Sequence, residues 1–421
     1  MSIHFGSAAK ASNSPDGYSP QRLFLASCIA LIATAMTFAI RGDIAGALSK
    51  RFSLSNERIG DAYSPAFFGF TIAIFVGGQL LDVFGAGAIL GLAFATHVAG
   101  LLTAIFATGF WTLWTGWLLV GLGNGLVEAA VNPLVATMYS HDKVHRLNRL
   151  HAWFPGGIVI GGLTAYGLTL LHIGWQVKVA TILIPVAVYG VMLLGQRYPR
   201  SERVQSNVST KEMYGELLRP LFILWLFCML LTATTELANE QWLPSIVNKV
   251  VGNNAILYLV LINGLMYVGR SFAGPIVHRL SPIGLLCGSA LFSLIGLVGL
   301  SYATTTATIF VATVLFAVGV CYFWPTMLGV TSERFPKGGS LLLGVMGAAG
   351  MLSVAIVLPV LGHFLDVSGN NPQLTFRYMA AVPLVLLAIF TAIYLRDRAR
   401  GGYRPVQLSA ASEPETAAAH E

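Results

Sequence analysis

Charged residues are scarce in this sequence. Only 10% of its 421 residues are Asp, Glu, Lys or Arg, whereas 55% are hydrophobic. Soluble globular domains carry about 25% charged residues, so the composition excludes that class. The formal net charge of +7 does not indicate nucleic-acid binding here, because an excess of Lys and Arg is typical of the cytoplasmic loops of membrane proteins.

Cysteines and catalytic motifs are also few. The four cysteines each lie in an apolar run without a Cys-x-x-Cys or Cys/His spacing, so we predict neither a disulfide framework nor a metal site. No Walker sequence, His-Glu-x-x-His motif or serine elbow stands in a polar segment large enough to house it. We therefore expect no enzyme, no ATP-driven pump and no cofactor beyond a coupling ion.

Long apolar runs make up most of the chain instead. A helix needs about 20 apolar residues to cross a bilayer, and runs of that kind recur from end to end. They predict an all-α polytopic membrane protein with twelve transmembrane helices, at 23–46, 60–82, 86–107, 110–137, 148–171, 176–196, 219–246, 254–278, 283–303, 307–331, 338–363 and 374–396.

The longest polar segment inside the chain, Gln196–Met213, separates the sixth span from the seventh. Six spans on each side of a charged linker is the layout of transporters built from repeated halves. The predicted parts are a disordered tail (1–22), a six-helix bundle (23–196), a cytoplasmic linker (197–218), a second six-helix bundle (219–396) and a disordered tail (397–421).

The positions of the basic residues predict the orientation. Most of the 25 Lys and Arg lie in the two tails, the linker and the loops on the same side, which places that side in the cytoplasm. The segment Lys50–Asp61 opposes this trend with three basic residues, partly balanced by two acids. The first 20 residues lack the apolar core of a signal peptide. We expect a monomer in the inner cell membrane with both termini cytoplasmic.

The stretch from Gly121 to Gly157 contains Glu128, a carboxylate inside an apolar run. Asn124, Glu128 and Asn132 recur every four residues, so a helix places them on one face. Small residues recur at the same spacing beside them, at positions 121, 125 and 129. A polar stripe next to a small-residue stripe suits a helix that packs closely on others and faces a wet cavity.

The junction of spans two and three, residues 77–85, resembles the G-x-L-x-D-x-x-G part of the major facilitator signature. The basic residues that usually follow are replaced by Ala-Gly-Ala. The resemblance implies a role in controlling helix ends that slide during transport, although an acid here can also serve simply as a helix-end carboxylate. We assign conformational gating to the matching residues and to the basic residue of the corresponding second-half junction: Gly78, Asp82, Gly85 and Arg270.

A closer resemblance rests on several blocks in order: GLVEAAVNP, RLNRLHAWF, ELANEQWLP, YFWPTMLG and GVMGAAGMLSVAIVLPVLGHFLD. Together they resemble the fucose/proton symporter family of the major facilitator superfamily, whose cousins include sodium-dependent glucose transporters. The resemblance implies that Asp43 and Glu128 are the proton-coupling carboxylates. The physical argument agrees, because an intramembrane acid costs on the order of 3 kcal/mol and usually marks an ion or substrate path. The alternatives are an Asp43–Arg41 pair near the helix end, and a Glu128 satisfied by Asn or Arg neighbours.

The predicted solute contacts follow from the same blocks. His151 and Phe154 stand where the resembled family has amides, so the hydrogen-bonding groups that face the sugar differ from those of the family. His151 can bind a hydroxyl or join proton transfer, or it is a helix-start histidine beside the basic loop. The predicted function is import of a small neutral solute, a monosaccharide, by proton symport. Sodium-coupled sugar transport, proton-coupled drug or metabolite export, and a non-transporting sensor remain alternatives. The predicted binding residues are Asn124, Asn132, His151, Glu236, Asn239, Gln241 and Trp324.

Overall fold

The computed structural model describes residues 17–54, 56–240, 255–367 and 372–408. Nearly all of these residues are helical, and none of them forms a β-strand. By length and composition, ten helices in these ranges could each cross a membrane. This confirms the prediction of an all-α polytopic membrane protein.

The N-terminal half contains one helix that covers two predicted spans. The chain reverses inside α2 at Gly85, where φ is 79° and ψ is 159°, a backbone conformation that is essentially restricted to glycine. The helices of this half are α1 (Pro20–Phe52), α2 (Asn56–Ile105), α3 (Phe110–Met138), α4 (Lys143–His151), α5 (Trp153–Leu170), α6 (Trp175–Thr181) and α7 (Leu183–Leu193).

The C-terminal half contains a corresponding reversal inside α13, at Ser281, with φ 62° and ψ 160°. With both reversals counted, each predicted span coincides with helix over most of its described residues. A π-helical turn, η2 (Thr234–Ala238), continues α10. The other elements are α10 (Pro220–Ala233), α12 (Ala255–Ser271), α13 (Ala273–Tyr302), α14 (Thr306–Val320), α15 (Phe323–Arg334), η3 (Pro336–Gly338), α16 (Gly339–Val367), α17 (Pro372–Met379) and α18 (Ala381–Ala399).

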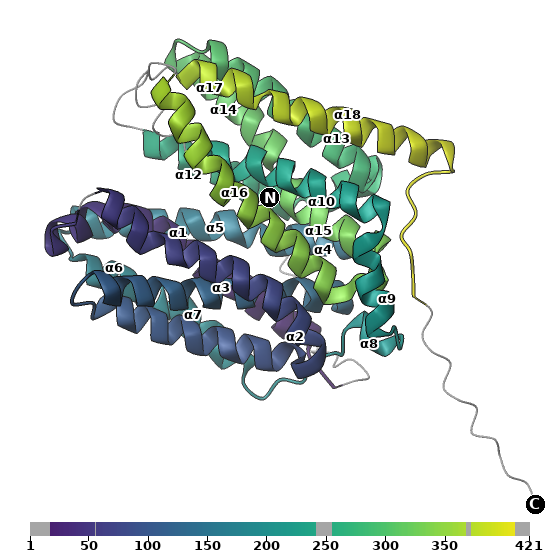
Figure 1. Cartoon of the computed structure of the whole chain (residues 1–421), viewed down its shortest axis with the longest axis horizontal. Coiled ribbons are helices and arrows are strands. Elements are labelled where there is room, and N and C mark those ends of the chain that lie inside the picture. The colour runs from purple at the N-terminus through teal and green to yellow at the C-terminus, as the bar shows by residue number, and fades with distance from the viewer. Residues whose placement is uncertain (1–16, 55, 241–254, 368–371, 409–421) are drawn as a thin grey trace, which may run out of the picture.

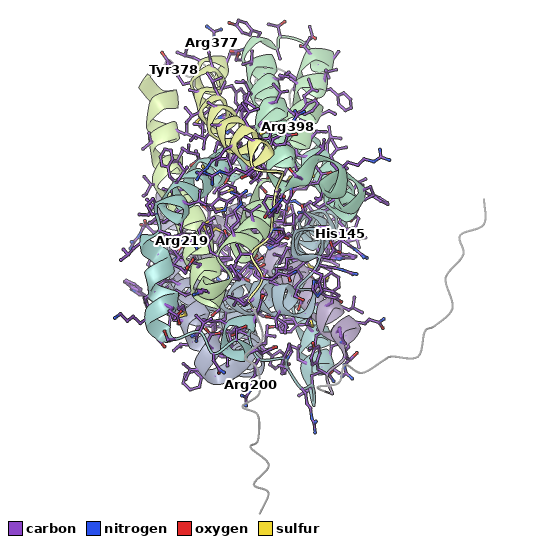
Figure 2. The ribbon with its side chains drawn as sticks, turned by 90° about the vertical axis from the view of Figure 1, so that its right-hand side faces the viewer. His145, Arg200, Arg219, Arg377, Tyr378 and Arg398 are labelled. Atoms are coloured by element: carbon purple, nitrogen blue, oxygen red, sulfur yellow. The ribbon has the colours of Figure 1, made fainter. Side chains whose placement is uncertain are left out.

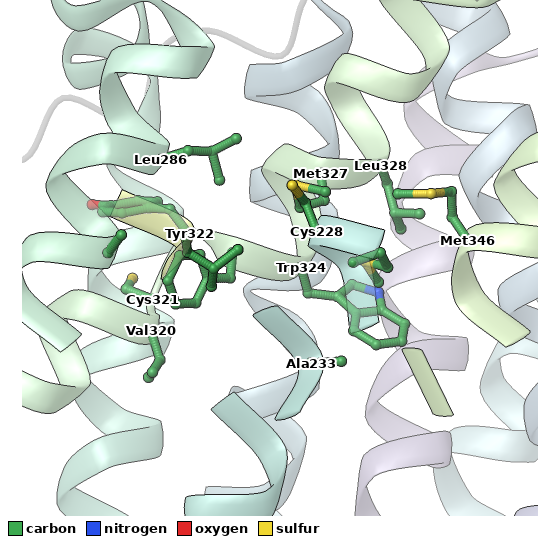
Figure 3. Close-up of a cluster of buried hydrophobic side chains, with 14 of the residues drawn as sticks. Cys228, Ala233, Leu286, Val320, Cys321, Tyr322, Trp324, Met327, Leu328 and Met346 are labelled. Atoms are coloured by element: carbon green, nitrogen blue, oxygen red, sulfur yellow. The ribbon is translucent and has the colours of Figure 1, made fainter. Parts of the chain in front are cut away.

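Each half has its own hydrophobic core. The N-terminal core surrounds Trp117, and the C-terminal core surrounds Trp225 and Phe316, all of them buried. Figure 3 shows part of the C-terminal core, with Trp324 of α15 among the side chains of α10 and α16. The two groups of helices, α1–α7 and α10–α18, lie on opposite sides of the molecule in Figure 1.

The small-residue stripe of α3 allows close contact with α2, as its spacing predicts. A Cβ atom on Gly121 would lie 2.1 Å from the carbonyl oxygen of Ala66, and one on Gly125 would lie 2.3 Å from that of Phe70. These backbones therefore approach more closely than any larger residue permits, which is how helices pack in lipid.

The two halves touch at the end of the molecule that carries the linker, which we call the linker side. There the linker forms α8 (Glu202–Gln205), α9 (Thr210–Gly215) and η1 (Glu216–Leu218). α4 packs on α15, and α2 packs on α16. Figure 2 is viewed from this end and labels His145, Arg200, Arg219 and Arg398.

Two of the predicted gating residues lie in the linker-side contacts. Asp82, at the end of the first part of α2, accepts hydrogen bonds from Ser201 Oγ and from Arg203 Nε, each at 2.7 Å. Gly78 faces α16 of the other half, where an added Cβ would lie 2.8 Å from the carbonyl oxygen of Ser340. Asp82 thus ties the linker to α2, and Gly78 lies in the surface between the halves.

Candidate functional site

Glu128 lies in the interior of α3, and its residue surface is only 3% exposed. Its Oε2 accepts a hydrogen bond of 2.8 Å from Asn132 Nδ2. The nearest basic nitrogen is His151 Nε2, at 3.9 Å. Glu128 is therefore buried with an amide donor beside it and without a lysine or arginine in ion-pair contact among the described residues.

Asn132 connects Glu128 to His151. Its Oδ1 lies 2.8 Å from His151 Nε2. Because the amide group of Asn132 donates to Glu128, its oxygen must accept, so His151 carries its proton on Nε2. Three predicted residues thus form one chain of hydrogen bonds, from His151 at the end of α4 to Glu128 on α3.

Arg270 lies at the same site, although the sequence suggested only a gating role for it. Its Nη2 donates to Glu236 Oε1 at 2.7 Å, and its Nη1 donates to the backbone oxygen of His151 at 3.2 Å. Its Nε donates to the backbone oxygen of Cys321. The guanidinium therefore binds its own half through η2 and the C-terminal end of α14, and the opposite half through α4.

A cavity of about 30 Å³ lies between the halves at this point. Pockets that hold small-molecule ligands have volumes of about 300–1,000 Å³, so a solute of that size enters only when the halves separate. The walls come from both halves, with α3, α4 and α5 on one side and η2, α12, α15 and α16 on the other. They are formed by Glu128, His151, Phe154, Glu236, Leu237, Arg270, Trp324 and Met351.

Asn124 does not line this cavity. Its Oδ1 lies 2.9 Å from His97 Nε2, and its Nδ2 donates to Thr37 Oγ1 at 3.0 Å. His97 in turn bonds Tyr189 through Nδ1. Asn124 therefore belongs to a buried polar network within the N-terminal half, while its predicted role in solute binding stays a prediction.

Asp43 lies apart from Glu128 as well. Its Oδ2 accepts a hydrogen bond of 2.5 Å from Lys178 of α6, and its side chain is 31% exposed. The expected alternative partner, Arg41, instead lies against aromatic rings, with its guanidinium carbon 4.7 Å from the ring centre of Phe67. The ion pair with Lys178 joins residues 135 positions apart, so no local sequence signal could reveal it.

The remaining predicted contacts lie around the C-terminal wall. Trp324 lines the cavity, whereas Asn239 is buried and donates to the backbone oxygen of Thr235. Gln241 lies outside the described residues. Glu240, the second acid that the sequence places in this span, is buried at 7% exposure, one helical turn beyond Glu236.

Comparisons with known proteins agree on one fold. The profile of the Major Facilitator Superfamily matches residues 23–340. The chain is 29% identical over 188 residues to the gentisate transporter of Corynebacterium glutamicum, a match that covers 42% of this chain and 40% of that protein. The match therefore spans about two fifths of the relative's length.

Solved structures of two sugar symporters superpose on nearly the whole chain. The outward conformation of FucP, the E. coli fucose:proton symporter, has a TM-score of 0.75 at 17% identity, and covers 88% of this chain and 98% of that chain. The proton:xylose symporter XylE has a TM-score of 0.72 at 16% identity, and covers 89% of this chain and 95% of that chain. At these identities the likeness concerns the fold.

Proposed function

The chain belongs to the Major Facilitator Superfamily, and on that premise we propose that it imports a small neutral solute, a monosaccharide, by proton symport and alternating access. The single observation that carries the proposal is the position of Glu128. It is a buried carboxylate without a lysine or arginine in ion-pair contact in the described part of the chain, and it lies at the surface between the two halves.

Glu128 suits the role of proton carrier for an energetic reason. Burying an ionised carboxylate without a cation costs several kcal/mol. A proton on the carboxyl removes that cost while the site is closed, and water restores the ionised form when the site opens. Glu236, in contrast, has Arg270 at 2.7 Å to balance its charge. The proton that drives transport is therefore assigned to Glu128.

Asp43 is proposed as an accessory acid in proton entry. Its side chain is nearly one-third exposed, and Lys178 holds its carboxylate near the end of α1 opposite the linker side. An exposed acid exchanges protons readily with water, whereas a buried one must wait for the site to open. We assign to Asp43 the delivery of protons toward Glu128 from that side.

Alternating access is supported by the contacts between the halves. Among the described residues, the hydrogen bonds between the halves join the linker-side parts of α4, α12 and α15. Asn148 Nδ2 donates to Thr326 Oγ1 at 3.3 Å, and Lys143 Nζ donates to the backbone oxygen of Ser332. The excess of basic residues on this side supports an orientation in the inner membrane in which this side faces the cytoplasm. Opening these contacts would release solute to the cytoplasm.

The chemistry of the cavity favours a neutral, hydroxyl-bearing solute. All three types of guanidinium nitrogen of Arg270 already donate to oxygen atoms, so an anion would have to displace existing bonds. The carboxyl and imidazole groups of Glu128 and His151 can bind hydroxyls. The aromatic faces of Phe154 and Trp324 can pack on the apolar face of a sugar ring.

A second candidate is proton-coupled transport of an aromatic acid. It is favoured by the partial likeness to a gentisate transporter and by Arg270 in the cavity wall, which could bind a carboxylate if it left Glu236. Sodium coupling in place of proton coupling is the corresponding alternative for the driving ion.

Uptake by the purified chain in liposomes separates these candidates. Monosaccharides and aromatic acids such as gentisate are offered in turn, with a pH gradient or a sodium gradient imposed separately. Accumulation of a sugar under the pH gradient alone is expected. Accumulation of only aromatic acids would select the second candidate. Uptake that depends on a sodium gradient at fixed pH would show that sodium, and not the proton, is the coupling ion.

A further inference from the structure

Glu240 is a buried acid that the proposed mechanism leaves unused. Its residue surface is 7% exposed, and the Asn263 side chain provides a hydrogen bond to its carboxyl group. Its Oε1 has no hydrogen-bond partner in the described part of the chain, and neither does Oε2 of Glu236. A buried carboxylate oxygen without a donor is costly, so protonation of one of these acids would lower the cost of burying them.

The charges near Glu240 do not balance if both acids are ionised. The charged groups that act on Glu240 are Glu236, on the same helix, and Arg270, on α12. α16 and α18 also pack on η2, but they carry no Asp, Glu, Lys, Arg or His at 339–357 or 381–395. In the part of the chain that the structure describes, two carboxylates thus share one guanidinium, which leaves one negative charge without a cation of its own.

The helix that carries both acids has an irregular turn at this place. Thr234–Ala238 form a π-helical turn, and such turns occur frequently at functional sites. Glu236 lies within the turn, and Glu240 lies two residues beyond its end. Glu236 lines the cavity, and Glu240 lies one helical turn beyond it, where the charges of Glu236 and Arg270 both act on its carboxyl group.

We propose that Glu236, Glu240 and Arg270 form a second proton-binding site, so that each transport cycle moves two protons with one solute. This inference rests on the proposed function. One proton bound to the carboxylate pair removes the excess negative charge and supplies a donor to an otherwise empty oxygen. The other proton is carried by Glu128 in the opposite half.

Arg270 can couple release of this proton to the movement of the halves. In the closed site its Nη1 donates to the backbone oxygen of His151, which belongs to the N-terminal half. Separation of the halves on the linker side breaks that bond. The freed N–H group can then donate to Glu240, so both carboxylates are ionised around one guanidinium. The proton leaves the carboxyl oxygen for water on the linker side.

The test is the balance point between a solute gradient and a pH gradient across liposomes that contain the full-length protein. The membrane potential is clamped at zero with potassium and valinomycin. With two protons per solute, a tenfold solute gradient is balanced by a pH difference of about 0.5, whereas one proton requires a difference of about 1. The wild-type protein is expected to balance near 0.5.

Variants of Glu240 test whether the second proton binds to the pair of Glu236 and Glu240. Glu240→Gln removes one protonation step and is expected to shift the balance point to about 1 pH unit, while Glu240→Asp keeps it near 0.5. A wild-type balance at about 1 would overturn the inference even if neither variant folds. A balance that stays near 0.5 in Glu240→Gln would overturn it too. Absence of any pH-driven flux in the wild type would instead refute the proposed proton coupling.

Discussion

At the scale of single residues, Asn132 determines how the acid and the imidazole of the site face one another. It donates to Glu128 and accepts from His151 with one planar amide. Each bond fixes one group, so neither can rotate freely toward a solute without breaking the chain. We therefore assign to Asn132 the role of orienting these two side chains, and to Glu128 the role of carrying the proton.

We predict that Asn132→Ala lowers proton-driven uptake by about 10- to 100-fold, because two buried hydrogen bonds worth about 1 kcal/mol or more each are lost at the site. Asn124→Ala is the matched variant on the same helix. It should lower the unfolding temperature, since His97 loses its partner, while the KM for solute stays near the wild-type value. An equal rise of KM in both variants would instead support the predicted solute contact of Asn124.

The residues found from sequence illustrate where local patterns suffice. Asn132 lies one turn from Glu128, so the helical period placed both correctly. Asn124 and Asn132 are eight residues apart, and a step of four advances about 40° around a helix, so they point about 80° apart. Because of this rotation around the helix axis, the side chain of Asn124 points into the N-terminal half instead of toward the cavity. Asp43 pairs with Lys178, and Glu236 pairs with Arg270. Each pair joins helices that are far apart in the sequence, so no local pattern could predict it.

At the scale of elements, the two reversals within α2 and α13 have nearly the same backbone angles but different residues. The reversal at Gly85 lies at the junction that the signature predicted between spans two and three. Ser281 adopts the same conformation with a side chain, at a cost on the order of 1–3 kcal/mol. Serine is not a marker of positive φ, so the sequence predicted the junction but not its strain.

Placing glycine at the second reversal and serine at the first should have opposite effects on the stability of the protein. Ser281→Gly relieves the strain and is predicted to raise the thermal unfolding temperature in detergent, because the gain exceeds the roughly 0.5–1 kcal/mol of extra chain entropy. Gly85→Ser should lower it for the same reason. A lower unfolding temperature for Ser281→Gly would contradict this account of the turn.

The linker helix α9 begins with a capping box that can be followed by pH. The backbone N–H of Ser209 donates to Glu212 Oε2, and Lys337 donates to Oε1. These bonds lower the pKa of the exposed Glu212 from 4.5 to about 2. The unfolded state therefore binds more protons between these values, so the contribution of Glu212 to stability is present above pH 4.5 and is lost as the pH falls toward 2.

The carboxyl carbon shift of labelled Glu212, recorded by NMR during an acid titration, measures that pKa directly. We expect a midpoint near pH 2, well below that of an ordinary glutamate. A midpoint near 4.5 would mean that the hydrogen bonds of the capping box and of Lys337 to this carboxylate do not form when the protein is in solution.

At the scale of the whole molecule, closure of the linker side depends on the close approach of α2 and α16. Gly78 and Gly344 leave no room for a side chain between these helices. Gly78→Leu is predicted to shift the population toward the linker-side-open state. Spin labels at Ser140→Cys and Arg398→Cys, one in each half, should report a longer distance than in the unmodified background.

Gly91→Leu is the matched control, because an added Cβ at Gly91 meets no atom within 4 Å. It should leave the label distance unchanged. An identical distance distribution in Gly78→Leu and Gly91→Leu would show that the α2–α16 contact does not control closure.

The central claim is that protonation of Glu128 drives accumulation of the solute. The direct measurement compares Glu128→Gln with the wild type in liposomes, for accumulation under a pH gradient and for exchange of preloaded solute. Glu216→Gln, a linker-side acid paired with Arg219, serves as the control. The account predicts that Glu128→Gln loses accumulation and keeps exchange, while the control keeps both. Accumulation by Glu128→Gln at the wild-type level would contradict it.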